Sequence, residues 1–284
     1  MAMRIDAHQH FWSYDPLEYG WIDESMASIR RDFLPTDLKP ELQKNGFHGS
    51  VLVQARQTLE ETRWQLELAK NNPFILGVVG WVDLRSPQLR AELESFAGNP
   101  KLVGIRHIVQ SEPDDFLLQP DFLRGISLLE EFDLTYDILI HTKHLAIAAE
   151  FVGRLPRQRF VLDHLAKPPI KSGAVDVWAR GMRELALFPN VLGKVSGLVT
   201  EADWGAWKPE DIQPYLDVAF ECFGPSRLMF GSDWPVCDVA ASYTQVVTLV
   251  KDYLSRYSAQ DREAVLGGNA ANFWRFKAPD PLLE

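Results

Sequence analysis

The sequence has very little cysteine, with Cys222 and Cys237 the only two in 284 residues. Two cysteines are too few for a disulfide framework in a chain of this size, and neither belongs to a C-x-x-C pair. We therefore expect two reduced, buried thiols. The sequence also lacks a charged and apolar leader before its first strand pattern and any run of about 18 apolar residues, so we expect a cytoplasmic protein with no membrane partner.

Basic charge is also scarce, since 29 lysines and arginines face 39 acidic residues, for a net charge of −10. No stripe of clustered Lys and Arg is present to neutralise phosphates, which argues against a nucleic-acid partner. A Gly-rich turn after the first strand is missing, which argues against a dinucleotide-binding fold. No G-x-S-x-G elbow occurs either, so a serine hydrolase lacks support. A small-molecule substrate is the partner that this composition favours.

No Ser/Gly/Pro-rich linker or charge block divides the chain, and we expect residues 1–284 to form a single domain. Short β-branched runs alternate with longer segments of helical spacing. The expected strands are Arg4–His10, Ser50–Gln54, Ile75–Val82, Leu102–His107, Thr135–Ile140, Arg159–His164, Asn190–Ser196 and Arg227–Gly231. The expected helices include Glu60–Asn71, Pro87–Ala97, Pro120–Glu131, Leu145–Arg154, Val175–Leu187 and Pro209–Cys222. Eight strands with intervening helices predict an α/β fold, a (β/α)8 TIM barrel.

The histidines gather at the ends of these strands, where the active sites of such barrels lie. Six of the seven fall at or just past a predicted strand end: His8, His10, His107, His141, His144 and His164. His8 and His10 also form a His-x-His pair, whose side chains project to the same side of a strand because strand residues alternate faces. Residues serving only the core or the surface would scatter over helices and loops as well, so this clustering indicates a site.

Asp233 ends the eighth expected strand, within the fragment Phe230-Gly231-Ser232-Asp233-Trp234-Pro235. Imidazoles and a carboxylate together hold a divalent cation that polarises a carbonyl and activates water. Asp233 is suited both to ligate the metal and to take the proton from the attacking water. The pattern therefore predicts metal-assisted hydrolysis.

Five ordered fragments carry a resemblance to a known family. They are Asp6-Ala7-His8-Gln9-His10-Phe11-Trp12, Gly104-Ile105-Arg106-His107, Leu162-Asp163-His164-Leu165-Ala166-Lys167-Pro168-Pro169, Gly231-Ser232-Asp233-Trp234-Pro235 and Gly268-Asn269-Ala270-Ala271-Asn272-Phe273. Spanning Asp6 to Phe273, the chain resembles the amidohydrolase superfamily, and within it the TIM-barrel hydrolases that include sugar lactonases and dicarboxylate lactonases.

The resemblance implies roles for particular positions. His8 and His10 match the strand-one pair, His164 the strand-six histidine and Asp233 the strand-eight aspartate, while His141 occupies a strand-five position at which many members place a further metal ligand. The implied metal site is therefore His8, His10, His141 and Asp233, holding one divalent ion such as zinc. Because some lactonases of this group work without a metal, its necessity stays open. Catalysis is then assigned to Asp233, His164 and His10.

The implied reaction is the opening of a sugar lactone, an aldonolactone, by direct attack of water on the carbonyl, with Asp233 as general base and then general acid. Two alternatives within the superfamily are a metal-dependent decarboxylase and a dicarboxylate lactonase. A third, from another class, is a barrel that binds a sugar acid without catalysis. A homodimer is compatible with the sequence.

Five residues at strand ends are candidates for substrate binding: Arg106, His107, Trp81, Gln54 and His144. Strand alternation allows either Arg106 or His107 to face the pocket but not both. A guanidinium suits a carboxylate and equally a row of sugar hydroxyls. We expect Asp163 to orient a neighbouring group rather than to react.

Overall fold

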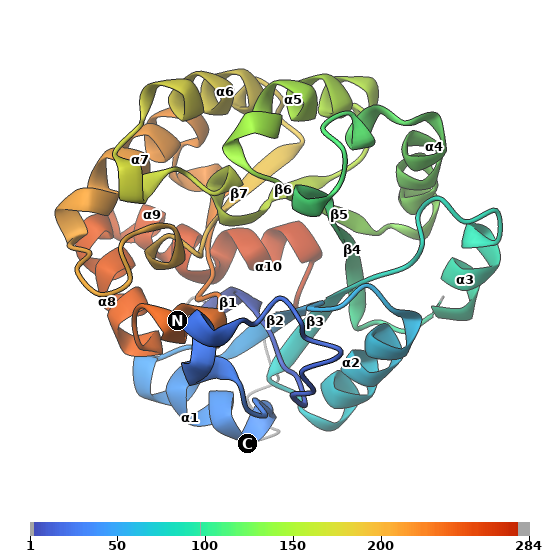
Figure 1. Ribbon diagram of the computed structural model, residues 1–284, viewed down its shortest axis with the longest axis horizontal. Helices are drawn as coiled ribbons and strands as arrows, with labels where there is room; N and C mark the ends of the chain where they lie inside the picture. Colours follow the sequence, from blue (N-terminus) through green and yellow to red (C-terminus); the bar gives the residue numbers. More distant parts are fainter. Residues whose placement is uncertain (1–2, 97, 278–284) are drawn as a thin grey trace.

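Eight parallel strands hydrogen-bond in the order of the sequence, from β1 to β8, and curve into a barrel (Figure 1). The computed structural model describes residues 3–96 and 98–277. The strands are β1 (Ile5–Gln9), β2 (Gly49–Val53), β3 (Ile75–Gly80), β4 (Leu102–Ile108), β5 (Thr135–Leu139), β6 (Phe160–Leu162), β7 (Val191–Val195) and β8 (Leu228–Phe230). The barrel closes where Gln9 forms a parallel bridge with Trp234, just beyond β8. The predicted (β/α)8 barrel is confirmed.

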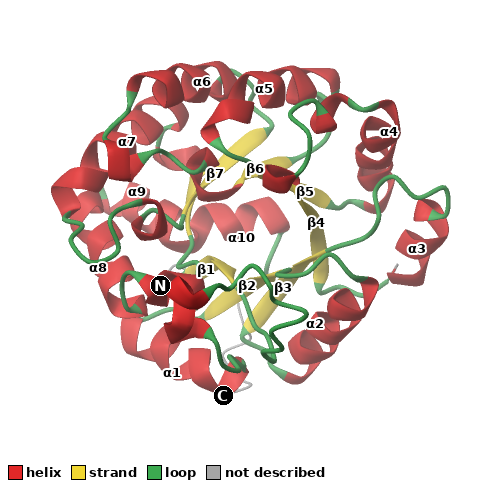
Figure 2. Cartoon of the chain, in the orientation of Figure 1, coloured by secondary structure: helices red, strands yellow, loops and turns green. Residues whose placement is uncertain are grey.

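The described residues form ten α-helices, most of which make a ring around the strands (Figure 2). They are α1 (Pro35–Asn45), α2 (Leu59–Asn71), α3 (Leu89–Phe96), α4 (Pro120–Leu129), α5 (Leu145–Arg154), α6 (Asp176–Ala186), α7 (Pro209–Phe223), α8 (Tyr243–Leu254), α9 (Ala259–Glu263) and α10 (Asn269–Trp274). Among the described residues, no helix combines the length and the apolar character needed to span a membrane.

The ends of the helices follow local chemistry. The Thr58 side chain accepts a hydrogen bond from the backbone of Glu61 and caps the start of α2. Ser242 caps α8 in a capping box with Gln245. At the end of α1, Gly46 adopts a left-handed φ of 77°, a conformation that glycine takes without a steric penalty.

Two apolar cores hold the barrel together. The larger core lies between the strands and the surrounding helices. The smaller one joins strand residues to α10, and its buried members are Ile5, Ala7, Val51, Val53, Val79, Val103, Val161, Met229, Ala270 and Trp274. α10 is the helix drawn across the centre of the ring in Figure 1, and its packing on these strand residues fills the barrel with side chains. The barrel interior at these strand residues is therefore filled with side chains.

Several observed strand boundaries differ from the expected ones by one or two residues, among them those of β6 and β8, which precede site residues. β6 stops at Leu162 and β8 at Phe230, short of His164 and Gly231. The reason lies just beyond these strands, where His164 and Asp233 adopt left-handed φ values of 50° and 59°, which extended strands exclude.

Two smaller expectations agree with the structure only in part. Both cysteines are free thiols. Cys237 is buried as expected, whereas Cys222, near the end of α7, is only partly buried. The helix expected over Pro87–Ala97 is observed as Leu89–Phe96, and Ala97 lies outside the described residues.

Candidate active site

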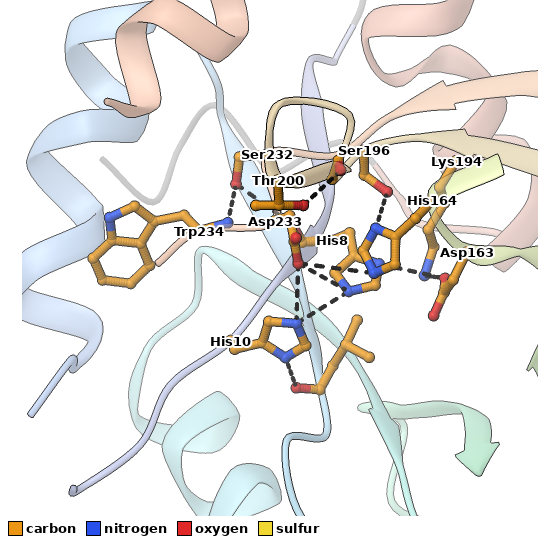
Figure 3. A network of polar contacts seen from close by, with 12 residues as sticks. His8, His10, Asp163, His164, Lys194, Ser196, Thr200, Ser232, Asp233 and Trp234 are labelled. Atoms are coloured by element: carbon orange, nitrogen blue, oxygen red, sulfur yellow. Dashed lines mark hydrogen bonds and ion pairs between the residues drawn. The ribbon is translucent and has the colours of Figure 1, made fainter. Parts of the chain in front are cut away.

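Four side chains from three strand ends converge at the top of the barrel (Figure 3). Nε2 of His8 lies 3.1 Å from Nε2 of His10. Oδ1 of Asp233 lies 3.4 Å from Nε2 of His10, 3.8 Å from that of His8 and 3.9 Å from that of His164. All four residues are at most 6% exposed. Three imidazole nitrogens therefore surround one carboxylate oxygen in a nearly dry environment.

The other ring nitrogen of each histidine faces an oxygen atom. Nδ1 of His10 lies 2.8 Å from the carbonyl oxygen of Val53, which only accepts hydrogen bonds, so Nδ1 carries the proton. Nδ1 of His164 lies 2.9 Å from Oγ of Ser196. Nδ1 of His8 lies 3.3 Å from Oδ1 of Asp163. Such contacts fix ring orientation. The carbonyl facing His10 and the carboxylate facing His8 only accept hydrogen bonds, so these two rings carry the proton on Nδ1 and direct the Nε2 lone pair toward the centre of the site.

The backbone at the site is strained. Four consecutive residues, His164 to Lys167, have φ between 48° and 59°, and Asp233 has φ of 59°. Left-handed backbone costs a non-glycine residue roughly 1–2 kcal/mol. Strain of this kind persists where the surrounding structure fixes it, and here it turns His164 and Asp233 toward each other.

Burial sets the protonation of the histidines. Burial lowers the pKa of His164 to about 4, although the nearby Asp233 carboxylate acts in the opposite direction. Burial likewise lowers the pKa of His8 well below its usual range, against the opposing effect of Asp163. Both rings are therefore neutral at pH 7, the form in which imidazole binds a metal.

Asp233 is ionised. Burial raises the pKa of its carboxyl, but the neighbouring His164 and His10 outweigh burial and hold the pKa below the ordinary value for aspartate. The site thus offers one carboxylate and neutral imidazoles to whatever binds there.

A cavity of about 490 Å³ opens over these groups. Its lining includes His10, His164, Asp233 and Arg106, together with loop residues that follow several strands. Those loop residues include Trp21, Met26, Gln57, Glu112, Lys167, Thr200, Glu201, Trp204 and Val236. Polar groups and indole rings share this wall, which suits a small polar ligand with an apolar face.

Of the five candidates for substrate binding, Arg106 alone lines this cavity. His107, next to it on β4, turns outward, stacks on Phe116 and lies 2.8 Å from a carboxylate oxygen of Glu112. The choice that alternation left open is thus resolved in favour of Arg106. Its guanidinium contacts Oδ2 of Asp163 at 3.0 Å and donates to the backbone carbonyl of Gln54.

The other three candidates lie outside the lining of the cavity. The Gln54 side chain is buried and approaches the backbone of Arg106 at 3.4 Å. The Trp81 indole donates to Nδ1 of His107 at 3.3 Å. His144 is buried and accepts a hydrogen bond from the backbone of His141.

His141 follows β5 but is exposed. It belongs to neither of the groups of potential metal-binding side chains that the described residues contain, which are His8, His10 and Asp233, and His8, Asp163 and His164. Its role as a metal ligand stays a prediction from the resemblance.

Sequence reasoning missed Lys194 and Asp137, two charged residues that are 0% exposed inside the barrel. Lys194 interrupts the apolar run of β7, and Asp137 that of β5, which was the available signal. Glu201 and Trp204 were also missed, because they lie on the loop after β7, whose path the sequence does not reveal.

The donor set fits a divalent metal such as zinc. His8, His10 and Asp233 present atoms 3.1–3.8 Å apart. Ligands at about 2.1 Å in a tetrahedral zinc site are roughly 3.4 Å apart. Neutral imidazoles with oxygen-bound Nδ1 atoms are the usual form of zinc-binding histidines.

Comparison with known proteins identifies the family. The family model of the amidohydrolases matches residues 5–276. This chain belongs to the amidohydrolase family. An L-fucono-1,5-lactonase from Burkholderia multivorans is 43% identical, and one from Burkholderia ambifaria is 40% identical, each over 98% of both chains.

Solved amidohydrolase structures share the fold closely. An amidohydrolase from Burkholderia multivorans, crystallised with bound zinc, superposes with a TM-score of 0.94 at 43% identity. The match covers 97% of this chain and all of that one. The similarity of this amidohydrolase to its relatives therefore extends over the entire barrel.

Proposed function

We propose that this amidohydrolase hydrolyses a sugar lactone, L-fucono-1,5-lactone or a close aldonolactone, to the sugar acid. The observation that carries the proposal is the Asp233 carboxylate, whose Oδ1 lies within 3.9 Å of three histidine nitrogens on the wall of a 490 Å³ cavity. The full-length similarity to two L-fucono-1,5-lactonases supports the choice of substrate.

In the reaction, Asp233 takes a proton from a water molecule as the water oxygen attacks the lactone carbonyl. The carbonyl oxygen becomes an oxyanion, and the Arg106 guanidinium at the cavity wall is placed to donate to it. When the tetrahedral intermediate collapses, the bond to the ring oxygen breaks, and Asp233 returns its proton to that oxygen. The product is an open-chain hydroxy acid, and no acyl-enzyme forms.

A metal fits this scheme without being needed to balance it. His8, His10 and Asp233 would hold a zinc ion, which would supply Lewis-acid polarisation of the lactone carbonyl. Nε2 of His164 faces the same carboxylate oxygen at 3.9 Å. Neutral imidazoles would hold such a metal, and in its absence Arg106 would be the group that donates to the oxyanion.

The cavity lining also contains groups that suit a polyhydroxylated ring. Nζ of Lys167 lies 3.5 Å from Oε1 of Glu201, so a cation and a carboxylate stand side by side, each about one quarter exposed. Such a pair offers donors and acceptors to adjacent hydroxyls. The Trp204 and Trp21 indoles, which also line the cavity, provide apolar surface for the carbon face of the sugar.

A decarboxylase or a dicarboxylate lactonase would need cations free to bind several carboxylates. Among the described residues that line the cavity, the cations are Arg106 and Lys167, and each already faces a carboxylate, Asp163 or Glu201. With Arg106 assigned to the oxyanion, Lys167 alone remains for substrate carboxylates, and it is paired with Glu201, which favours a neutral lactone. Intact acid–base and histidine groups likewise favour catalysis over simple binding of a sugar acid.

The test is a proton-release assay with L-fucono-, L-galactono- and D-arabinonolactone, a dicarboxylate lactone and an aromatic carboxylic acid, before and after chelation. We expect turnover on a stereochemical subset of the aldonolactones. Activity that survives chelation would assign the chemistry to the protein groups, and activity restored by zinc would assign part of it to the metal. Turnover of the dicarboxylate lactone alone, or release of CO2 from the acid, would contradict the proposal.

A further inference from the structure

A lysine lies fully buried beneath the active site. Lys194, on β7, is 0% exposed, and its ammonium group donates to Oδ2 of Asp137 on β5. The same nitrogen lies 3.0 Å from Oδ1 of Asp163, which follows β6 (Figure 3). None of these three residues lines the cavity, so none is placed to touch the substrate.

Asp163 connects this lysine to the groups above it. Oδ1, which faces Lys194, is also 3.3 Å from Nδ1 of His8, and Oδ2 accepts a hydrogen bond of 3.0 Å from Arg106. The guanidinium of Arg106 approaches Nε2 of His8 at 3.3 Å. One carboxylate therefore holds both the proposed metal-binding His8 and the proposed oxyanion donor.

β7 supports a second histidine from the same face. Ser196 is the first residue after β7 and comes two residues after Lys194, so the alternation of the strand directs both side chains to the same side. The Ser196 hydroxyl contacts Nδ1 of His164 at 2.9 Å. β7 thus contributes no residue to the metal-binding groups but underpins two of the histidines above it.

Stability gives little reason for such an arrangement. Two buried acids and two buried bases, Asp137, Asp163, Lys194 and Arg106, balance in charge, but buried ion pairs contribute weakly to stability compared with apolar residues of the same volume. A cluster of this kind directly under the site, with its contacts aimed at His8 and Arg106, is better explained by orientation.

We infer that Lys194 is a positioning residue: by fixing the Asp163 carboxylate it sets the orientation of His8 and Arg106, and through them the metal affinity and the reaction rate. The part that concerns rate rests on the proposed lactonase function. The part that concerns His8 does not, because ring orientation and metal affinity are measured without substrate.

The test uses Lys194→Met and the charge-balanced double variant Asp137→Asn with Lys194→Met, which leaves no additional unpaired carboxylate. Zinc affinity is measured by competition with a chelating dye, and the His8 tautomer by the ring ¹⁵N spectrum of the metal-free protein. We expect zinc binding to weaken by roughly 10–100-fold, as for other groups that orient metal ligands, and kcat to fall by a similar factor. We expect His8 to lose its single Nδ1-protonated form.

The matched control is Lys101→Met, which removes a partly buried lysine just before β4. The Nζ atom of Lys101 donates to the backbone carbonyl of Ile75 at 2.6 Å. This variant should keep wild-type zinc affinity, histidine spectrum and rate. If Lys194→Met fails to fold, the double variant decides. A folded variant with the wild-type His8 spectrum and zinc affinity would overturn the inference, even if the protein melts at a lower temperature. A changed spectrum in a protein that hydrolyses no lactone would support the positioning role and contradict only the proposed function.

Discussion

Gly197 lies so close to the His164 ring that the structure has no room for a side chain at position 197. A Cβ atom on Gly197 would lie 2.5 Å from Nδ1 of His164 and 3.1 Å from Oδ2 of Asp233. Gly197 also has a φ of 63°, which glycine adopts without strain. The loop after β7 can therefore pass beside the site only because this position has no side chain.

The variant Gly197→Ala should displace His164 and lower kcat/KM at least tenfold. Gly173→Ala is the matched control, because Gly173 has a φ of 69° but no atom within 4 Å of its Cβ position. Both variants bear the cost of a left-handed alanine, about 1 kcal/mol, but only the first meets a catalytic side chain. Equal kinetics for the two proteins would show that the close contact has no catalytic consequence.

The acid limit of activity should lie well below the titration range of an ordinary histidine. Burial lowers the pKa of His164 to about 4, so the ring stays neutral from pH 7 down to about pH 5 and becomes protonated only below that. A profile of kcat/KM against pH should therefore fall with a midpoint near 4. Far-UV circular dichroism at each pH confirms that the protein remains folded. A midpoint near 6.5 would contradict the neutral, buried ring.

Glu61 should make stability depend on pH. One oxygen of this carboxyl accepts from the backbones of Ala55 and Arg56, and burial raises its pKa to about 7. The folded state therefore binds a proton that the unfolded state has released above about pH 4.5, so the stabilisation is present below that range and is lost as pH rises to 7.

Against Glu61→Gln, which keeps the accepting oxygen, wild type should lose about 2–3 kcal/mol of relative stability between pH 5 and pH 8. Urea unfolding of both proteins at the two pH values measures this change. A constant difference between them would mean that Glu61 titrates normally.

Replacing His10 should weaken zinc retention. His10→Ala removes one of the three atoms that surround the proposed metal position, while His48→Ala removes an exposed histidine that accepts from the backbone of Arg4, before β1. Elemental analysis after dialysis against zinc should show loss of metal in the first variant only. Unchanged metal content in His10→Ala would exclude it as a ligand.

The barrel and the central part of the site follow from patterns that a sequence displays directly. Regular alternation of strands and helices predicts the fold, and histidines at strand ends predict where His8, His10 and His164 meet. Alternation does not predict the backbone conformation beyond a strand. The left-handed turn at His164–Lys167 ends β6 two residues earlier than expected, although it contains no glycine. Strain that tertiary packing enforces leaves no local signature.

The sequence also does not reveal which charged residues meet inside the barrel. Lys194 stands in an apolar strand, and only the closed barrel brings it to Asp137 and Asp163, 57 and 31 positions away in the sequence. The choice between Arg106 and His107 was open because strand alternation only requires that neighbouring side chains point to opposite faces. It does not say which of the two faces the interior of the barrel. Pairing of β4 with its neighbours in the barrel decides it.

The measurement that tests the account most directly is hydrolysis of L-fucono-1,5-lactone by wild type and Asp233→Asn, compared at equal concentration after both proteins are shown to have the same melting curve. Asparagine keeps the shape of the side chain but cannot take the proton from water. We predict turnover by wild type and a loss of at least 1,000-fold in kcat for the variant, within the range expected when a general base is removed. Full activity of Asp233→Asn would contradict the proposed mechanism, and inactivity of the wild type would contradict the proposed function.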